Sequence, residues 1–162
     1  VLRENFITRV FAWHNWKQLV AEGLTAARLT RFHARYKYTL MAHNPQEYQC
    51  LGRILADAGN DNPAELGERY FAALMQALQN KATRNTNTNV LMHLQGYLKK
   101  RLQPGEKKSM GEIIEQYRKG IVPLIVPVTL LRHFFALHPD PYISQQAFLQ
   151  PYPDDLSLRN DL

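Results

Sequence analysis

The stretch Asn44-Pro45-Gln46-Glu47 places three helix-starting residue types in the order in which a helix uses them. The asparagine can accept a hydrogen bond from free amides, the proline has no amide to leave unpaired, and the early glutamate favours the positive helix end. Asn62-Pro63-Ala64-Glu65 repeats this order. The two stretches therefore predict two helix starts. They look alike because of their capping chemistry, and they do not indicate a domain repeat.

Helical spacing also covers the start of the chain. A first helix is expected over residues 3–22 and ends at Gly23, and a second runs from Thr25, its N-cap, to about residue 42. The apolar residues that support the first helix recur at helical intervals: Phe6, Val10, Trp13 and Val20.

The second half of the chain continues the pattern. Residues 85–89 read as a polar loop before a fifth, leucine-rich helix that stops near Pro104. Ser109 and Glu112 have the spacing of a capping box for a sixth helix, which ends at Gly120.

Two prolines define the expected seventh helix. Either Pro123 or Pro127 should lie in its first turn, where a missing amide costs little, and the other in the extended entry. The helix should be largely buried, and Asp140 should cap a last short helix.

Length and composition favour one folded domain. The chain has 162 residues, of which 45% are hydrophobic, and no linker divides it. We expect an all-α, single, compact, bundle-like domain of about seven or eight helices over residues 1–162, with an irregular acidic tail from about residue 150.

Cysteine content and hydropathy restrict the location. Cys50 is the only cysteine, which excludes an internal disulfide and suits a reducing compartment. The longest apolar run, residues 121–131, is shorter than the roughly 20 residues of a membrane span. We expect a cytoplasmic protein without a membrane partner. Because the sequence begins with Val1 rather than Met, a longer gene product is an open alternative.

Two long stretches lack acidic residues. No Asp or Glu occurs in residues 23–46 or 69–105, and these stretches hold ten of the 20 lysines and arginines. Residues 1–138 contain 19 basic and 10 acidic residues, whereas the last 24 residues carry a net negative charge. The positive body predicts a polyanionic partner.

The stretch Arg31-Phe32-His33-Ala34-Arg35-Tyr36-Lys37-Tyr38 interleaves basic and aromatic side chains. On a helix, Arg28, Arg31 and Arg35 form one line, and their planar guanidinium groups suit successive phosphates. No carboxylate lies one turn away to pair with them. This pattern favours a nucleic acid, and an ordinary solvated helix face is the alternative.

The expected fifth helix ends in basic residues as well. Lys99, Lys100 and Arg101 lie near its C-terminus, where the helix dipole alone would favour them. Gly96 in mid-helix costs about 1 kcal/mol relative to alanine. Close packing of a neighbouring helix is the expected reason for this glycine, with approach of a ligand as the alternative.

The sequence contains no recognisable reaction centre. Its six histidines lack helical zinc spacing, and no glycine-rich phosphate loop, nucleophile elbow or Cys–His set occurs. We therefore assign no catalytic residue and no metal ligand, and enzymatic activity stays open.

Several blocks together resemble the YbgA-like family, bacterial domains of unknown function. The resemblance covers nearly the whole chain, although Tyr36 departs from it where many relatives carry histidine. The blocks are residues 3–7, 32–37, 42–43, 89–93, 96–99, 117–127, 138–142 and 158–160.

The resemblance carries a functional expectation. Family members occur alone or fused behind a cysteine-rich domain similar to thiouracil desulfidases, which hold an iron–sulfur cluster through three cysteines. The resemblance therefore implies that this chain is the RNA-binding accessory domain of a thiouridine desulfidase-type protein, with tRNA as the expected RNA. One cysteine cannot supply three thiolates, so we expect no cofactor in this chain and the cluster in a fused or partner domain. The side chains expected at the RNA are Arg28, Arg31, His33, Arg35, Lys37, Tyr38, His43, Asn89, His93, Tyr97, Lys99, Lys100, Arg101 and Arg118.

Two other functions are kept as alternatives. One is a protein-docking module, which would use apolar surface of residues 121–131 that one core cannot hide. The other is a stand-alone enzyme whose polar side chains meet in one pocket. The candidates for that pocket are His33, Lys37, His43, Asn89, His93 and Arg118.

Overall fold

The computed structural model of the protein describes residues 2–57, 59 and 61–160. These residues form eight α-helices and a short 3-10 helix, without any strand, which confirms the all-α class and the expected number of helices. The elements are α1 (Leu2–Glu22), α2 (Ala26–His43), α3 (Pro45–Ala56), α4 (Pro63–Ala77), α5 (Arg84–Leu98), α6 (Pro104–Arg118), α7 (Ile125–Leu137), α8 (Pro141–Ser144) and the 3-10 helix Asp154–Leu156.

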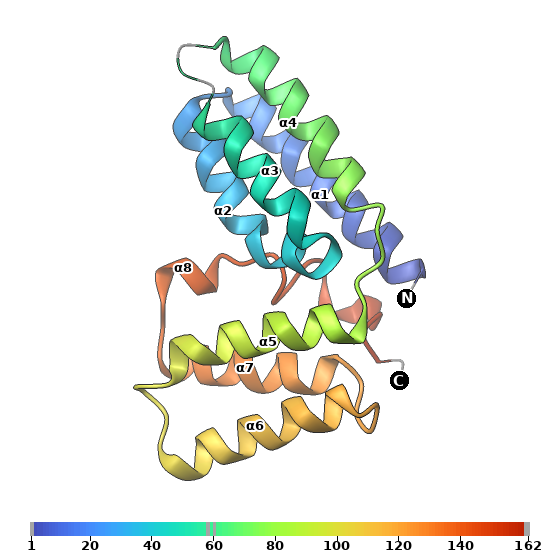
Figure 1. The fold of residues 1–162 in the computed structure, drawn as a ribbon, viewed down its shortest axis with the longest axis vertical. Helices are drawn as coiled ribbons and strands as arrows, with labels where there is room; N and C mark the ends of the chain where they lie inside the picture. Colours follow the sequence, from blue (N-terminus) through green and yellow to red (C-terminus); the bar gives the residue numbers. More distant parts are fainter. Residues whose placement is uncertain (1, 58, 60, 161–162) are drawn as a thin grey trace.

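The helices form two groups (Figure 1). Helices α1 to α4 lie side by side at the top of the view, α5 to α7 pack at the bottom, and α8 lies between the two groups. Each group has its own apolar core, and α2 contributes to both. Its Leu29, Phe32 and Leu40 belong to the first core, whereas Tyr38 and Ala42 belong to the second. Helix α2 therefore joins the two halves of the molecule.

Most of the predicted helix caps are confirmed. The side chain of Thr25 accepts a hydrogen bond at the start of α2, and Asn44 and Asn62 do the same for α3 and α4, each followed by proline. The Asp140 carboxylate accepts from two amides of α8. Gly23 follows α1 with a φ of +98°, a left-handed conformation that glycine adopts without strain.

Two predicted helix starts are wrong. Residues 85–89 are not a loop, because Thr83 caps α5 and forms a reciprocal capping box with Thr86. Helix α6 begins at Pro104, five residues before Ser109, and its capping box pairs Gln103 with Glu106. In both cases an equivalent cap lies closer to the preceding helix than the one that the sequence suggested.

The apolar run of residues 121–131 is largely internal. Pro127 lies in the first turn of α7 and Pro123 precedes the helix, as predicted. Val128 and Leu131 are 1% and 0% exposed, and Ile121 is the one large apolar side chain of the run that is strongly exposed. The run therefore offers little apolar surface to a docking partner.

Helix α1 has its apolar residues on the unexpected side. Its buried residues are Asn5, Thr8, Ala12 and Trp16. The apolar residues that predicted the helix, among them Phe6 and Trp13, are exposed. The periodicity identified the helix correctly without identifying the face that enters the core.

Candidate nucleic-acid interface

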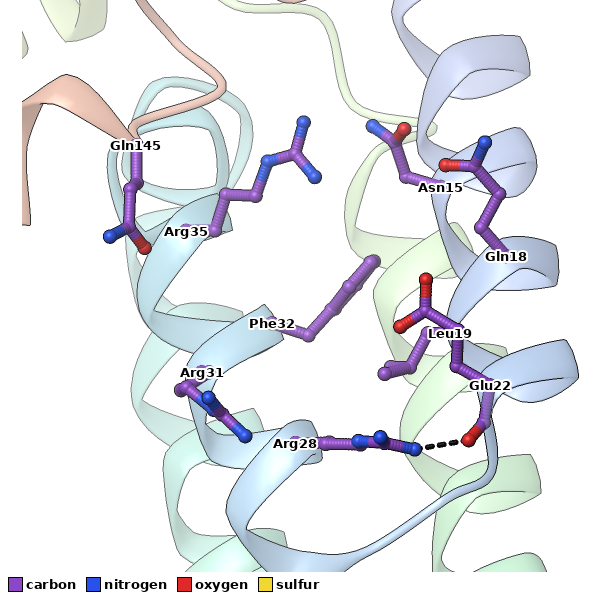
Figure 2. A pocket seen from close by; sticks show the side chains of 9 residues that line it. All are labelled: Asn15, Gln18, Leu19, Glu22, Arg28, Arg31, Phe32, Arg35 and Gln145. Carbon is purple, nitrogen blue, oxygen red and sulfur yellow. Dashed lines mark hydrogen bonds between the residues drawn. The ribbon is translucent and has the colours of Figure 1, made fainter.

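Three arginines of α2 face a cleft between α1 and α2 (Figure 2). The cleft has a volume of about 370 Å³. Arg28, Arg31 and Arg35 line one wall, because residues three and four apart share a helix face. The other lining residues are Phe32 of α2, Asn15, Gln18, Leu19 and Glu22 of α1, and Gln145 beside α8.

Arg31 and Arg35 have no partner among the described residues. Both side chains are exposed, and neither forms an ion pair or a hydrogen bond within that part of the chain. The Arg35 guanidinium carbon lies 6.0 Å from the centre of the Tyr36 ring, which helps to orient it. These two residues keep their hydrogen-bond donors available for an anion.

Besides lining the cleft, Arg28 has a structural role. Its Nη1 donates to the carbonyl oxygens of Glu22 and Gly23, so that it satisfies the C-terminal end of α1. Across the cleft, Asn15 donates to the Tyr36 hydroxyl at 2.8 Å. The Glu22 carboxylate also lies in the cleft (Figure 2), so the three arginines exceed the local acid by two charges.

Lys37 lies in a separate tyrosine cluster made of Tyr38, Tyr48, Tyr97 and Tyr142. Its ammonium is 5.2 Å from the Tyr38 ring and 6.0 Å from the rings of Tyr48 and Tyr142. Tyr38 donates a hydrogen bond to the Tyr97 hydroxyl at 3.4 Å. The cluster therefore connects α2, α3, α5 and α8 around one cation.

Three phenol groups of this cluster, those of Tyr38, Tyr48 and Tyr142, stay protonated at neutral pH. Burial raises the pKa of Tyr38 and Tyr48, and it raises the pKa of Tyr142 to about 12. Tyr97 and Tyr142 are 40% and 36% exposed, and their ring centres are 6.2 Å apart. They present hydrogen-bond donors and ring surface to solvent.

The basic end of α5 is only partly available. Arg101 donates to the backbone oxygens of His138 and Pro139, and so it anchors the end of α7. Lys99 and Lys100 are exposed and form no ion pair with any described residue. Lys37 approaches this region through Tyr142 and Tyr97. One continuous positive face that also includes Arg31 and Arg35 stays a prediction.

The positive charge of Arg118 is compensated by a neighbouring carboxylate. Arg118 donates two hydrogen bonds of 2.7 and 2.6 Å to the carboxylate of Glu115, and these bonds lower the pKa of that carboxyl to about 2. Asn89 and His93 are exposed on α5. The structure therefore leaves Asn89 and His93 on the surface and gives Arg118 a local partner.

His33 differs from the expectation of a surface contact. It is 9% exposed, its Nδ1 lies 3.1 Å from the Tyr70 hydroxyl, and its ring stacks on Tyr48 at 5.1 Å. Burial lowers the pKa of the imidazole to about 4, so it is neutral at pH 7. His33 packs α2 against α3 and α4, and it offers no charge to a phosphate.

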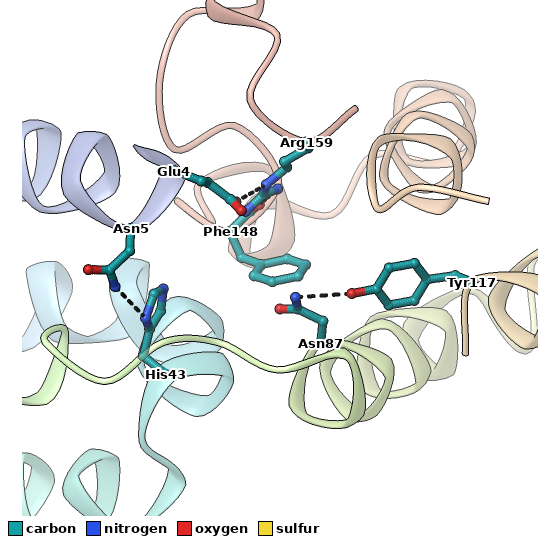
Figure 3. A network of polar contacts seen from close by, with 7 residues as sticks. All are labelled: Glu4, Asn5, His43, Asn87, Tyr117, Phe148 and Arg159. Carbon is teal, nitrogen blue, oxygen red and sulfur yellow. Dashed lines mark hydrogen bonds and ion pairs between the residues drawn. The ribbon is translucent and has the colours of Figure 1, made fainter. Parts of the chain in front are cut away.

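His43 belongs to a polar network where α1, α2 and the segment before α5 meet (Figure 3). Its Nδ1 lies 2.6 Å from the Asn80 carbonyl oxygen, and the Asn5 amide lies 3.3 Å away. In the same region Arg159 pairs with Glu4 at 2.8 Å. The cavity among these residues measures about 20 Å³, which is room for about one water and not for a substrate.

The pocket expected of a stand-alone enzyme is not assembled. His33 and Lys37 share contacts with Tyr48, but His43 lies at the network of Figure 3 and Arg118 pairs with Glu115. Of the candidates, His33 and His43 thus hold chain segments together, whereas Asn89 and His93 lie on the surface.

A larger cavity lies between α7 and the C-terminal segment. It measures about 720 Å³ and contains Arg132 and Arg159. Asp154 accepts two hydrogen bonds from Arg132, at 2.9 and 3.0 Å, and Glu4 pairs with Arg159. Because its arginines are compensated, this cavity lacks the free positive charge of the α1–α2 cleft.

Within residues 2–57, 59 and 61–160, no cluster of three or more histidine, cysteine or acidic side chains is arranged to hold a metal ion. The helices of the same residues include none with the length and apolar character needed to cross a membrane.

Sequence reasoning missed the α1 wall of the cleft. Asn15 and Gln18 are ordinary polar residues of a long helix, and no motif distinguishes them. The arginine line on α2 was visible because its spacing is local. The opposite wall depends on which face of α1 packs against α2. The apolar periodicity of α1 pointed to the wrong face, so the wall could not be predicted.

Comparisons with known proteins identify a family without assigning an activity. The family described as "Protein of unknown function (DUF1722)" matches residues 37–153. The "Uncharacterized protein YbgA" of Escherichia coli (strain K12) is 33% identical over 158 residues, which cover 97% of this chain and 94% of that protein. No solved structure matches the chain.

Proposed function

The chain belongs to this YbgA-like family, and we propose that it binds structured RNA, with tRNA as the substrate class, through the α1–α2 cleft. The observation that carries the proposal is the pair Arg31 and Arg35, two exposed guanidinium groups one turn apart without any described anionic partner. Such a pair matches successive phosphates of a nucleic-acid backbone.

The surroundings of the pair support RNA over a small anion. A single phosphate needs one cation site, whereas this chain exposes Arg31 and Arg35 in the cleft and also Lys99 and Lys100 after α5, which could hold further phosphates. Exposed Tyr97 and Tyr142 provide ring surface for an unstacked base and hydroxyls for a sugar or phosphate. Arg31 and Arg35 would hold the backbone, and the tyrosine cluster would contact a loop or an end.

The proposed role is accessory to a thiouridine desulfidase. This chain would hold tRNA while a separate cysteine-rich domain removes sulfur. The iron–sulfur cluster of that chemistry does not fit here, because Cys50 is the only cysteine and three thiolates are needed.

Binding is favoured over catalysis by the same geometry. The candidates for an acid–base pocket are either buried in packing contacts, as is His33, or engaged in an ion pair, as is Arg118. The α1–α2 cleft is lined by three arginines, three side-chain amides, Leu19, Phe32 and the Glu22 carboxylate, so Glu22 is the one candidate general base among the lining residues and no second acid–base group accompanies it there.

Fluorescence anisotropy with labelled tRNA tests the proposal. A DNA duplex of equal phosphate number and heparin serve as competitors. Preference for tRNA over the duplex is expected, since shape and 2′-hydroxyl contacts distinguish RNA. If the DNA duplex and heparin compete as well as unlabelled tRNA does, the binding is nonspecific charge binding. Absence of tRNA binding at low salt would refute the proposal.

A further inference from the structure

The outer face of α1 carries an apolar stripe that nothing in the described chain covers. Five large side chains of α1 are 39–68% exposed. At about 100° per residue they fall within roughly 80° of the helix circumference, beside the buried face. This α1 stripe consists of Leu2, Phe6, Val10, Trp13 and Val20.

The α1 stripe is large for a surface feature of a monomer. It runs from the first turn of α1 to the last, which is about 27 Å at 1.5 Å per residue. A phenylalanine or tryptophan buries about 150–250 Å² when it is covered, and the stripe contains one of each. Contiguous apolar patches of this extent mark interaction sites.

We propose that the α1 stripe is the interface of a homodimer, in which two α1 helices pack antiparallel across a twofold axis near residues 11 and 12. A twofold interface requires a surface that complements itself. In this register, residue numbers that face each other add up to 22 or 23. The α1 stripe meets that condition: Leu2 faces Val20 of the second copy, Val10 faces Trp13, and Phe6 faces Lys17.

The one charged residue within the stripe fits the register. Lys17 already lies 5.8 Å from the centre of its own Trp13 ring. Opposite the Phe6 ring of the second copy, its ammonium would gain a second aromatic face, and its methylene groups would cover apolar surface.

The composition of the α1 stripe suits the centre of a dimer interface. A stable interface buries about 800 Å² on each partner, with an apolar centre and a polar rim. The α1 stripe would supply the centre, and the exposed Arg3 and His14 would lie on the rim. In the antiparallel register Arg3 faces the region of Val20, so the basic residues of the two copies do not oppose one another.

The dimer would leave both RNA clefts open. The α1 residues that line the cleft, such as Gln18 and Glu22, lie on a different side of the helix from the stripe. Dimerisation and RNA binding are therefore separable. They also respond to salt in opposite ways, because salt screens repulsion between two positive chains and weakens contacts to phosphate.

Sedimentation velocity of the isolated chain tests the dimer. At about 50 µM we expect twice the monomer mass, because interfaces of this class reach micromolar dissociation constants or tighter. Phe6→Glu combined with Trp13→Glu should give a monomer. Ile121→Glu is the matched control, since Ile121 is 61% exposed outside α1 and should leave the dimer intact.

Two results would contradict the proposed homodimer. Far-ultraviolet circular dichroism establishes that each variant is folded. A monomeric wild-type chain at this concentration would overturn the proposal and would leave the stripe for a different protein or for a membrane surface. A dimer that persists in the folded double variant would place the interface elsewhere.

Cross-linking tests the register. In a Cys50→Ser background, Val10→Cys places two thiols about 4 Å apart along the helix axes, and a short bismaleimide should join them. Leu2→Cys places them about 28 Å apart along the axes, so it should not react across the dimer. Efficient cross-linking through both positions would indicate parallel helices and would contradict the antiparallel interface.

Discussion

Helices α2 and α5 contain no carboxylate, yet their basic residues are used differently. On α2, Arg31 and Arg35 face an open cleft without a described partner. After α5, Arg101 is tied to backbone oxygens, and only Lys99 and Lys100 are free of such contacts. The absence of acidic residues from a stretch of sequence therefore does not tell how many of its basic side chains are free to bind an anion. Backbone carbonyls at helix ends compete for arginine as carboxylates do.

The largest effect is expected from charge reversal in the cleft. Arg31→Glu with Arg35→Glu should lower tRNA affinity on the order of 100-fold or more, because two attractions to phosphate become repulsions. Anisotropy titration measures the change. Lys107→Glu with Lys108→Glu on α6 is the control, because it makes the same change in net charge at exposed sites away from α1 and α2. Equal losses in both variants would show that only net charge matters.

A smaller effect is expected at the end of α5. Lys99→Glu with Lys100→Glu should reduce tRNA affinity roughly three- to tenfold, since these lysines would hold backbone at the periphery. It should also lower stability by about 0.3–1 kcal/mol, because cations favour a helix C-terminus. If this variant loses more affinity than the cleft variant, the end of α5 contributes more to tRNA binding than the cleft does, contrary to the proposal.

The buried side of α2 should make the stability of the fold depend on pH, and it should not contribute to RNA binding. The pKa of His33 is about 4 when folded and ordinarily 6.5, so the unfolded chain binds more protons between those values. Stability should therefore fall as pH decreases from 6.5 to 4. Urea unfolding should give a shallower pH dependence for His33→Gln than for wild type. His133→Gln removes an exposed histidine instead and serves as the control, and an equally large change in that variant would contradict the assignment to His33.

The smallest effect concerns glycine on α5. A Cβ at Gly96 would meet no atom within 4 Å, so close helix packing does not explain this residue. Gly96→Ala should stabilise the fold by up to about 1 kcal/mol, measured by urea unfolding. Gly67→Ala is the contrast and should gain less, because its Cβ would lie 2.7 Å from the Leu24 Cδ1 atom, which must then move. If Gly96→Ala instead weakens RNA binding, the α5 surface contacts the ligand closely.

Local signals in the sequence predicted the fold better than the site. Caps such as Asn44 and Asp140 act within a few residues, so their chemistry can be read directly. The burial of the seventh helix was predicted from its apolar run, but the partners that cover it, from α5, α6 and the C-terminal segment, could not be read from that run. The burial of His33 likewise depends on Tyr70 and Tyr48, which lie far away in sequence.

The salt dependence of tRNA binding tests the central claim most directly. Each phosphate neutralised by a protein cation releases counterions and adds about 0.7–0.9 to the slope of log affinity against log salt. Wild type should show a steep negative slope, and Arg31→Gln with Arg35→Gln should flatten it by about 1.4–1.8. An identical slope in the folded variant, or binding by wild type that is insensitive to salt, would contradict an arginine cleft that holds the RNA backbone.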